Sequence, residues 1–299
     1  MLILMIIIWF LTYISARKLD SKETYDNNSL FLVKNASLRV IGGHKVRKNR
    51  YTYVVLLTRR RGDELKRICT ACMLAEQWVL TAAHCCTGNA NIAFSNLYIW
   101  YGNFTISAST TNLYSHVLNT FVHPSYRLIR RPYFKNVNDI GLLRVDKINM
   151  PSYGRLLAVD HTSLIGLPVT FLGGGRTNLT MPVNGLAPLH AGEGVIIACD
   201  VDFASNRVIC ISPKCSNKMN SPNKGDSGSP LIHDGYVIGV CSYGRTRKKY
   251  VNNAYTPIIQ QKLSLIMGTL TSFRLITPCP TNLVNVKVCE DGCLLLKHA

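Results

Sequence analysis

The sequence predicts an all-β protein, built from many short strands as a sandwich or as barrels. Between Val40 and about Thr256, short apolar runs are broken repeatedly by Gly, Pro and Asn, and none reaches the length of an ordinary helix. Several runs are rich in Val, Ile and Tyr, which favour strands. The 299 residues are 47% hydrophobic and 17% charged, so the chain can bury a core and is not disordered as a whole.

The expected strands follow one another along the chain at residues 51–57, 77–80, 97–101, 141–145, 169–172, 194–197, 207–211 and 236–240. The period then changes. Residues 257–270 begin with Pro257, and their apolar side chains recur on one helical face, so we expect a helix there. A tail with three cysteines follows this helix: Cys279, Cys289 and Cys293.

The N-terminal segment is almost wholly apolar. Residues 1–16 end in Ala16 before a basic pair, which is typical of a secretory signal peptide. No basic residue precedes the apolar core, so a retained anchor is the alternative, although a membrane span needs about 20 residues. Eleven cysteines are ordinary for a disulfide-bonded secreted protein and favour cleavage; their odd number leaves at least one free or paired outside the chain.

Residues 17–39 are polar, lack cysteine and end at Arg39. Two Asn-x-Ser/Thr acceptors lie in this segment and two lie beyond it, which fits a secreted glycoprotein. The four acceptor residues are Asn27, Asn35, Asn103 and Asn178.

The chain is strongly basic, with 34 Lys+Arg against 16 Asp+Glu and a net charge of +18. Such a surface is either simply solvated or attracts a polyanion. Its clusters fall at residues 45–50, 59–61, 127–135 and 245–249.

Three motifs carry the chemistry. A histidine follows an expected strand in residues 81–85 (TAAHC), an acid begins one in residues 138–143 (NDIGLL), and a serine lies between glycines in residues 225–230 (GDSGSP). A serine hydroxyl needs an adjacent base to act as a nucleophile, and histidine, with a pKa of about 6.5, can move a proton in both directions. The rival Gly-x-Ser-x-Gly hydrolases have the chain order Ser, Asp, His, and here Ser229 takes the place of their last glycine.

Together with residues 40–43 (VIGG), these motifs resemble the chymotrypsin/trypsin family of secreted serine proteases over roughly residues 39–270. The resemblance implies two antiparallel Greek-key β-barrels with a C-terminal helix. It also implies that Ser227 is the nucleophile, that His84 is the general base and acid, and that Asp139 orients the imidazole. The backbone N–H groups of Gly225 and Ser227 match the family's oxyanion hole.

Arg39 and Val40 resemble the family's activation site. Cleavage after Arg39 would free the amine of Val40, which in the family pairs with the acid before the nucleophile, here Asp226. The domains expected are therefore a signal peptide (1–16), an activation propeptide (17–39), a protease domain (40–270) and a cysteine-containing extension (271–299).

The family's pattern also suggests disulfides and a specificity pocket. The cysteines match two family bridges, Cys69–Cys85 and Cys199–Cys210, and the parallel offsets of Cys72 and Cys86 suggest a third pair. The substrate-binding residues implied are Ser221 at the pocket base, the strand segment Ser242, Tyr243 and Gly244, and Asn253 on the opposite wall. No acid lies at the base, so we expect neutral or apolar residues, rather than Lys or Arg, before the cleaved bond.

The function expected is a secreted serine endopeptidase made as a zymogen. The alternative is a weak or inactive homologue that binds a partner or polyanion through its basic surface, since residues 173–175 are all glycine where the family usually has a central Trp. We expect protein or peptide substrates, an activating protease and a monomer. A glycosaminoglycan-like polyanion is the candidate partner, while nucleic acid and membrane are not expected. We expect no cofactor and no metal, because residues 103–112, where trypsins bind calcium, contain no acid.

Overall fold

The structure is a computed structural model. It describes residues 40, 43–47, 49–87, 96–129, 135–158, 160–175, 186–199, 208–213, 221–247, 250–258 and 293–294. The expected signal peptide, the propeptide with Arg39, the acceptors Asn27, Asn35 and Asn178, and most of the C-terminal extension lie outside these residues.

Six strands of the first half form a closed antiparallel barrel in the order β2-β3-β4-β9-β6-β5. Alternate residues along these strands point inward, and Val55, Leu57, Val79, Ile99 and Leu143 fill the barrel. The bounds of the strands are β2 (Val54–Arg61), β3 (Glu64–Ala75), β4 (Trp78–Thr81), β5 (Leu97–Trp100), β6 (Tyr114–Val122) and β9 (Gly141–Val145).

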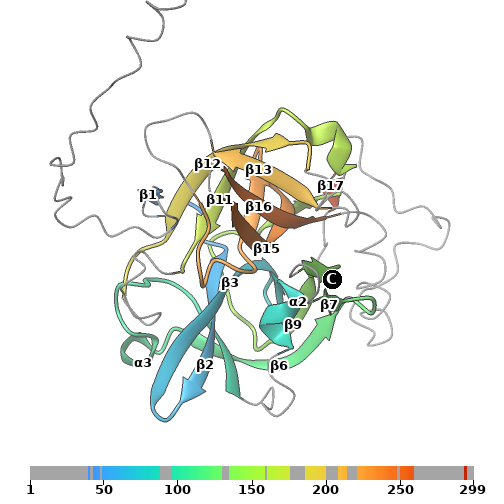
Figure 1. Ribbon diagram of the computed structural model, residues 1–299. Helices are drawn as coiled ribbons and strands as arrows, with labels where there is room; N and C mark the ends of the chain where they lie inside the picture. The colour runs from blue at the N-terminus through green and yellow to red at the C-terminus, as the bar shows by residue number, and fades with distance from the viewer. Residues whose placement is uncertain are drawn as a thin grey trace, which may run out of the picture. The chain divides into compact units, whose positions relative to one another are not determined.

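Six strands of the second half form the other barrel. They follow the order β14-β11-β12-β13-β16-β15, and the pairing of β14 with β15 closes the ring. Phe171, Ile196, Ile211, Leu231 and Tyr255 pack in its core. The bounds are β11 (Pro168–Gly173), β12 (His190–Ile197), β13 (Ile209–Pro213), β14 (Pro230–His233), β15 (Tyr236–Arg247) and β16 (Tyr250–Pro257). The fold is therefore two antiparallel β-barrels, as predicted (Figure 1).

Smaller elements join the barrels or border them. Strand β1 (His44–Lys45) pairs with β12, and β10 (Arg155–Leu157) lies parallel to β15 and pairs on its other side with β17 (Cys293–Leu294). Strands β7 (Arg127–Ile129) and β8 (Lys135–Val137) form a separate hairpin just before β9. The described helices are single turns: α2 (Ala83–Cys86), α3 (Ala108–Thr111) and the 3-10 turn His161–Leu164.

The expected helix from Pro257 is wrong at its start. Pro257 is the last residue of β16 and is paired with Gly239, a position where a missing N–H costs little because the strand ends there. The rest of that prediction, after Ile258, lies outside the described residues. Within the described part of the chain, no helix is long and apolar enough to cross a membrane.

Candidate active site

His84 and Asp139 meet at the rim of the first barrel. His84 lies on α2, the single turn that follows β4, and Asp139 lies between β8 and β9. The turn before Asp139 needs a left-handed residue, and Asn138 supplies it with φ +53°. The backbone N–H of His84 donates to Asp139 Oδ1 over 2.8 Å, and its ring Nδ1 lies 2.7 Å from Asp139 Oδ2. Asp139 is fully buried, so both bonds form away from water.

A third hydrogen bond to the Asp139 carboxylate comes from the second barrel. Ser242 Oγ, on β15 of the second barrel, donates to Asp139 Oδ2 over 2.5 Å. A carboxylate accepts hydrogen bonds but has no proton to give, so Nδ1 of His84 carries the ring proton. The lone pair of His84 then lies on Nε2, the atom that a general base needs.

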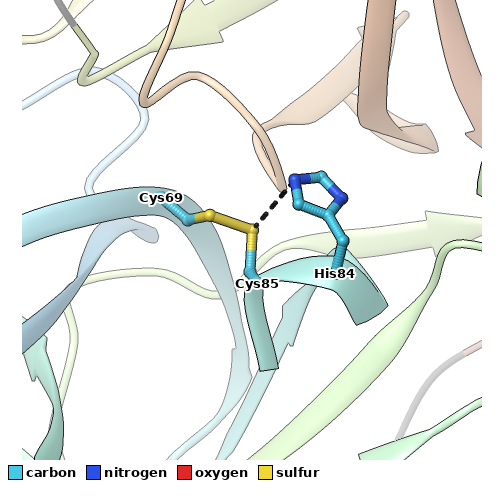
Figure 2. Close-up of side chains that lie close together, drawn as sticks. All are labelled: Cys69, His84 and Cys85. Atoms are coloured by element: carbon cyan, nitrogen blue, oxygen red, sulfur yellow. Dashed lines mark hydrogen bonds between the residues drawn. A yellow bond between two sulfur atoms is a disulfide. The ribbon is translucent and has the colours of Figure 1, made fainter. Parts of the chain in front are cut away.

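The loop that carries Ser227 packs against strands β3 and β4. The backbone N–H of Thr70 donates to the carbonyl of Ser227 over 2.8 Å. Gly225 and Gly228 have φ +97° and +82°, and a side chain at Gly228 would come within 2.3 Å of the Thr70 carbonyl oxygen. Cys69, next to Thr70, is bonded to Cys85, next to His84 (Figure 2). Residues 225–228, called the serine loop below, and His84 are thus both anchored to β3.

Asp226, just before Ser227, is fully buried. Its Oδ1 accepts from the N–H of Gly175 over 2.7 Å, and its Oδ2 accepts from the N–H of Asn223 over 2.8 Å. Val40 is also fully buried and packs in the core of the second barrel. A Cβ placed on Gly173 would lie 2.3 Å from Asp226 Oδ1 and 2.7 Å from Val40 Cγ2. Val40 and Asp226 therefore border the same small space.

Known proteins with similar sequences decide the family. The Trypsin family model matches residues 40–263. Duodenase-1 of Bos taurus is 26% identical over 248 residues, which are 78% of this chain and 88% of that protein. Kallikrein 1-related peptidase b27 of Mus musculus is 30% identical over 227 residues (69% and 80%), and chymotrypsin-2 of Vespa crabro is 28% identical over 227 residues (73% and 94%). The chain belongs to the trypsin family. It is a serine endopeptidase.

The residues expected to line the specificity pocket lie on β15, on β16 and in the segment before β14. Ser221 is buried and its Oγ donates to the carbonyl of Pro222 over 3.2 Å. The register of β15 and β16 pairs Gly244 with Asn253, so these two backbone positions face each other across adjacent strands. Ser242 was expected only to bind substrate backbone; its hydroxyl in addition contacts Asp139.

The structure contains the two disulfides expected from the trypsin family, Cys69–Cys85 and Cys199–Cys210. The suggested pairing of Cys72 with Cys86 is wrong, because both are free, buried thiols, as is Cys241. The two thiols face different neighbours: a Cβ on Gly154 would lie 2.4 Å from Cys72 Sγ, whereas Cys86 Sγ donates to the Ala82 carbonyl.

One cluster has the composition of a metal site. The sulfurs of Cys69 and Cys85 and a ring nitrogen of His84 lie within 4.8 Å of one another, and Nε2 lies 3.7 Å from Cys85 Sγ (Figure 2). The two sulfurs are bonded to each other, and metals are bound by thiolates. In this oxidised state the cluster braces the histidine and is not a metal centre.

Thr70 is a site residue to which no motif in the sequence points. Its hydroxyl lies beneath the serine loop, 2.8 Å from the carbonyl oxygen of Gly225. The only signal in the sequence is its position next to Cys69 of the bridge that braces His84.

Proposed function

We propose that this endopeptidase is a secreted zymogen whose catalytic residues are Ser227, His84 and Asp139. The observation that carries the proposal is the hydrogen bonding of the buried Asp139 carboxylate. It accepts from His84 Nδ1 over 2.7 Å and from Ser242 Oγ over 2.5 Å. This arrangement orients the imidazole and favours the imidazolium that forms when Nε2 takes a proton. A purely structural acid has no need of a histidine held in this tautomer.

In the first half-reaction, His84 Nε2 takes the proton of Ser227 Oγ as this oxygen bonds to the substrate's carbonyl carbon. The carbonyl π electrons move to the oxygen, and the N–H groups of Gly225 and Ser227 stabilise the resulting oxyanion. When the oxyanion collapses, the C–N bond breaks and His84 gives its proton to the leaving amine. Ser227 is left as an acyl ester.

The second half-reaction repeats these steps with water. His84 takes a proton from water, the hydroxide oxygen bonds to the ester carbonyl, and the C–O bond to Ser227 breaks as His84 returns the proton to Oγ. The product is a free carboxylate, and the enzyme regains its starting protonation state.

The position of Val40 supports activation by cleavage after Arg39. The Val40 side chain and Asp226 Oδ1 both lie next to Gly173, where an added Cβ would meet both of them. A newly freed Val40 ammonium would lie near a buried carboxylate, Asp226, that accepts from the backbone N–H groups of Gly175 and Asn223. The pairing would order the loop of Gly225 and Ser227.

Further details of the proposal rest on single residues. Ser221 at the expected pocket base carries no charge, which favours neutral or apolar side chains before the cleaved bond. Secretion is supported by Asn103, an exposed acceptor whose Oδ1 accepts from Thr105 Oγ1 over 2.7 Å, so that its amide is presented at the surface.

The proposal is tested by labelling with a fluorophosphonate probe after cleavage at Arg39. We expect one adduct per chain, on Ser227, and none in the Ser227→Ala variant. Asp139→Asn is expected to lower the labelling rate about 10⁴-fold, because Asn donates to Nδ1 and favours the wrong tautomer. A cleaved and folded wild-type protein that takes no label would contradict the proposal.

A second candidate function is binding of a glycosaminoglycan-like polyanion, either alongside proteolysis or in place of it. It is favoured by three consecutive arginines, Arg59 to Arg61, at the tip of the β2–β3 hairpin of a chain with a net charge of +18. The Arg60 guanidinium lies over the Tyr98 ring, 4.6 Å from its centroid. This contact holds the cation in place on an otherwise flexible side chain.

A further inference from the structure

Thr70, in the middle of β3, is fully buried and lies at the contact between the first barrel and the serine loop. Its backbone N–H donates to the Ser227 carbonyl over 2.8 Å. Its hydroxyl donates to the Gly225 carbonyl over 2.8 Å and accepts from the Gly174 N–H over 3.1 Å. One side chain thus contacts two segments, residues 173–175 and 225–227, that are far apart in the sequence.

These hydrogen bonds join the two segments in a closed ring of contacts. The Thr70 hydroxyl accepts from the N–H of Gly174, and the next N–H along the chain, of Gly175, donates to Asp226 Oδ1 over 2.7 Å. Asp226 is covalently joined to Gly225, whose carbonyl returns to the Thr70 hydroxyl. The peptide between Gly225 and Asp226 is therefore held at its oxygen, and the two N–H groups proposed for the oxyanion lie on either side of it.

The segment that Thr70 contacts has no side chain of its own to hold it, because residues 173–175 are all glycine. In this chain a Cβ on Gly174 would come within 2.1 Å of Leu56 Cδ2, so Leu56 occupies the space. The segment is held through its backbone instead: Thr70 Oγ1 accepts from the Gly174 N–H, and Arg67 Nη1 donates to its carbonyl over 3.5 Å.

We propose that Thr70 is a positioning residue for the oxyanion hole, acting through the hydrogen bond from its hydroxyl to the Gly225 carbonyl. This inference rests on the proposed roles of Ser227 and Gly225. An oxyanion exists only during the reaction, so misplaced N–H donors weaken binding of the transition state more than binding of the substrate. Loss of the Thr70 hydroxyl should therefore lower kcat and leave KM nearly unchanged.

The test is the nearly isosteric variant Thr70→Val in the cleaved enzyme. We expect kcat to fall about tenfold, the usual effect of one neutral hydrogen bond, while KM changes less than about twofold. Affinity for a peptide boronate, which forms a tetrahedral adduct with the serine, should fall by the same factor as kcat. Thr70→Ser keeps the hydroxyl and should restore both. Thr70→Ala, which also lacks the hydroxyl but is smaller, should reproduce the fall if the Val variant does not fold.

Thr58→Val is the matched control. Thr58 is a fully buried threonine of the same barrel, on β2, and its hydroxyl donates over 3.0 Å to the carbonyl of Tyr98 on the adjacent strand β5, a contact within the first barrel. It should lose stability without a selective loss of kcat. An equal fall of kcat in Thr58→Val, or a wild-type kcat in Thr70→Val and Thr70→Ala, would overturn the inference. Persistence of activity in Ser227→Ala would instead overturn the proposed function, so the two failures are distinct.

Discussion

Burial raises the pKa of three free thiols, Cys72, Cys86 and Cys241, because a thiolate in the core would lose its hydration. The unfolded chain releases these protons at a pH of about 8.5, whereas the folded chain keeps them. Folded-state pKa values above the unfolded value make the free energy of unfolding highest below this pH and lower as the pH rises through it.

Urea unfolding at pH 7 to 10 measures this effect. We expect the free energy of unfolding of the wild type to decrease above a pH of about 8.5, and to decrease less in a variant with Cys72, Cys86 and Cys241 all changed to Ala. The cysteines common to both proteins cancel in the difference. Identical pH profiles would show that the three thiols are not buried in the folded state.

Residues in contiguous motifs were predictable, and those that act across the fold were not. The roles proposed for His84, Asp139 and Ser227 each rest on a short motif in the sequence. The hydroxyl of Ser242 meets a carboxylate 103 positions away, and that of Thr70 meets a carbonyl 155 positions away. Only the closure of the two barrels brings these atoms together, so no local pattern reports them.

At the scale of elements, the β2–β3 hairpin carries the second candidate function. Changing Arg59, Arg60 and Arg61 together to Ser should lower the salt concentration at which the protein elutes from heparin, since fewer counterions are released on binding. The comparison variant removes the same charge from another of the basic clusters, at the exposed Lys45, Arg47 and Arg50. Equal shifts in both triple variants would show that net charge, rather than this hairpin, governs binding.

Strands β3 and β6 were missed by the sequence analysis because their side chains do not alternate regularly along the whole strand. Strand β3 begins with charged residues on the exposed hairpin and ends in a stretch buried between β2 and β4, so it has no single period. Strand β6 alternates regularly only until a bulge between Val117 and Asn119 shifts its register. By contrast, β9 is apolar apart from Arg144 and was predicted at its observed bounds.

At the scale of the whole molecule, the burial and backbone conformation of Val40 fit the proposed activation by cleavage after Arg39. It is fully buried and has φ +50°, a left-handed conformation that is strained for a β-branched residue and costs about 1–3 kcal/mol. Cleavage after Arg39 removes the peptide bond whose carbonyl carbon defines this φ angle, and with it the constraint on φ. It also creates an ammonium group on a residue whose side chain borders the same glycine, Gly173, as Asp226 Oδ1. Both effects favour the cleaved form.

The proposed activation by cleavage predicts that one of three proteins is far more active than the other two; the three are cleaved wild type, cleaved Asp226→Asn and uncleavable Arg39→Gln. We expect fluorophosphonate labelling of Ser227 to be fast only in the first. Removing one partner of a buried ion pair costs about 3–5 kcal/mol, enough to lower the population of the ordered loop and the labelling rate by at least about 100-fold. The cleaved wild type should also unfold at a higher temperature than Arg39→Gln, because the pairing exists only in the folded state. Labelling of Arg39→Gln at the rate of the cleaved wild type would show that the serine loop is ordered without the Val40 amine, and that the contacts of Thr70 and Gly175 suffice.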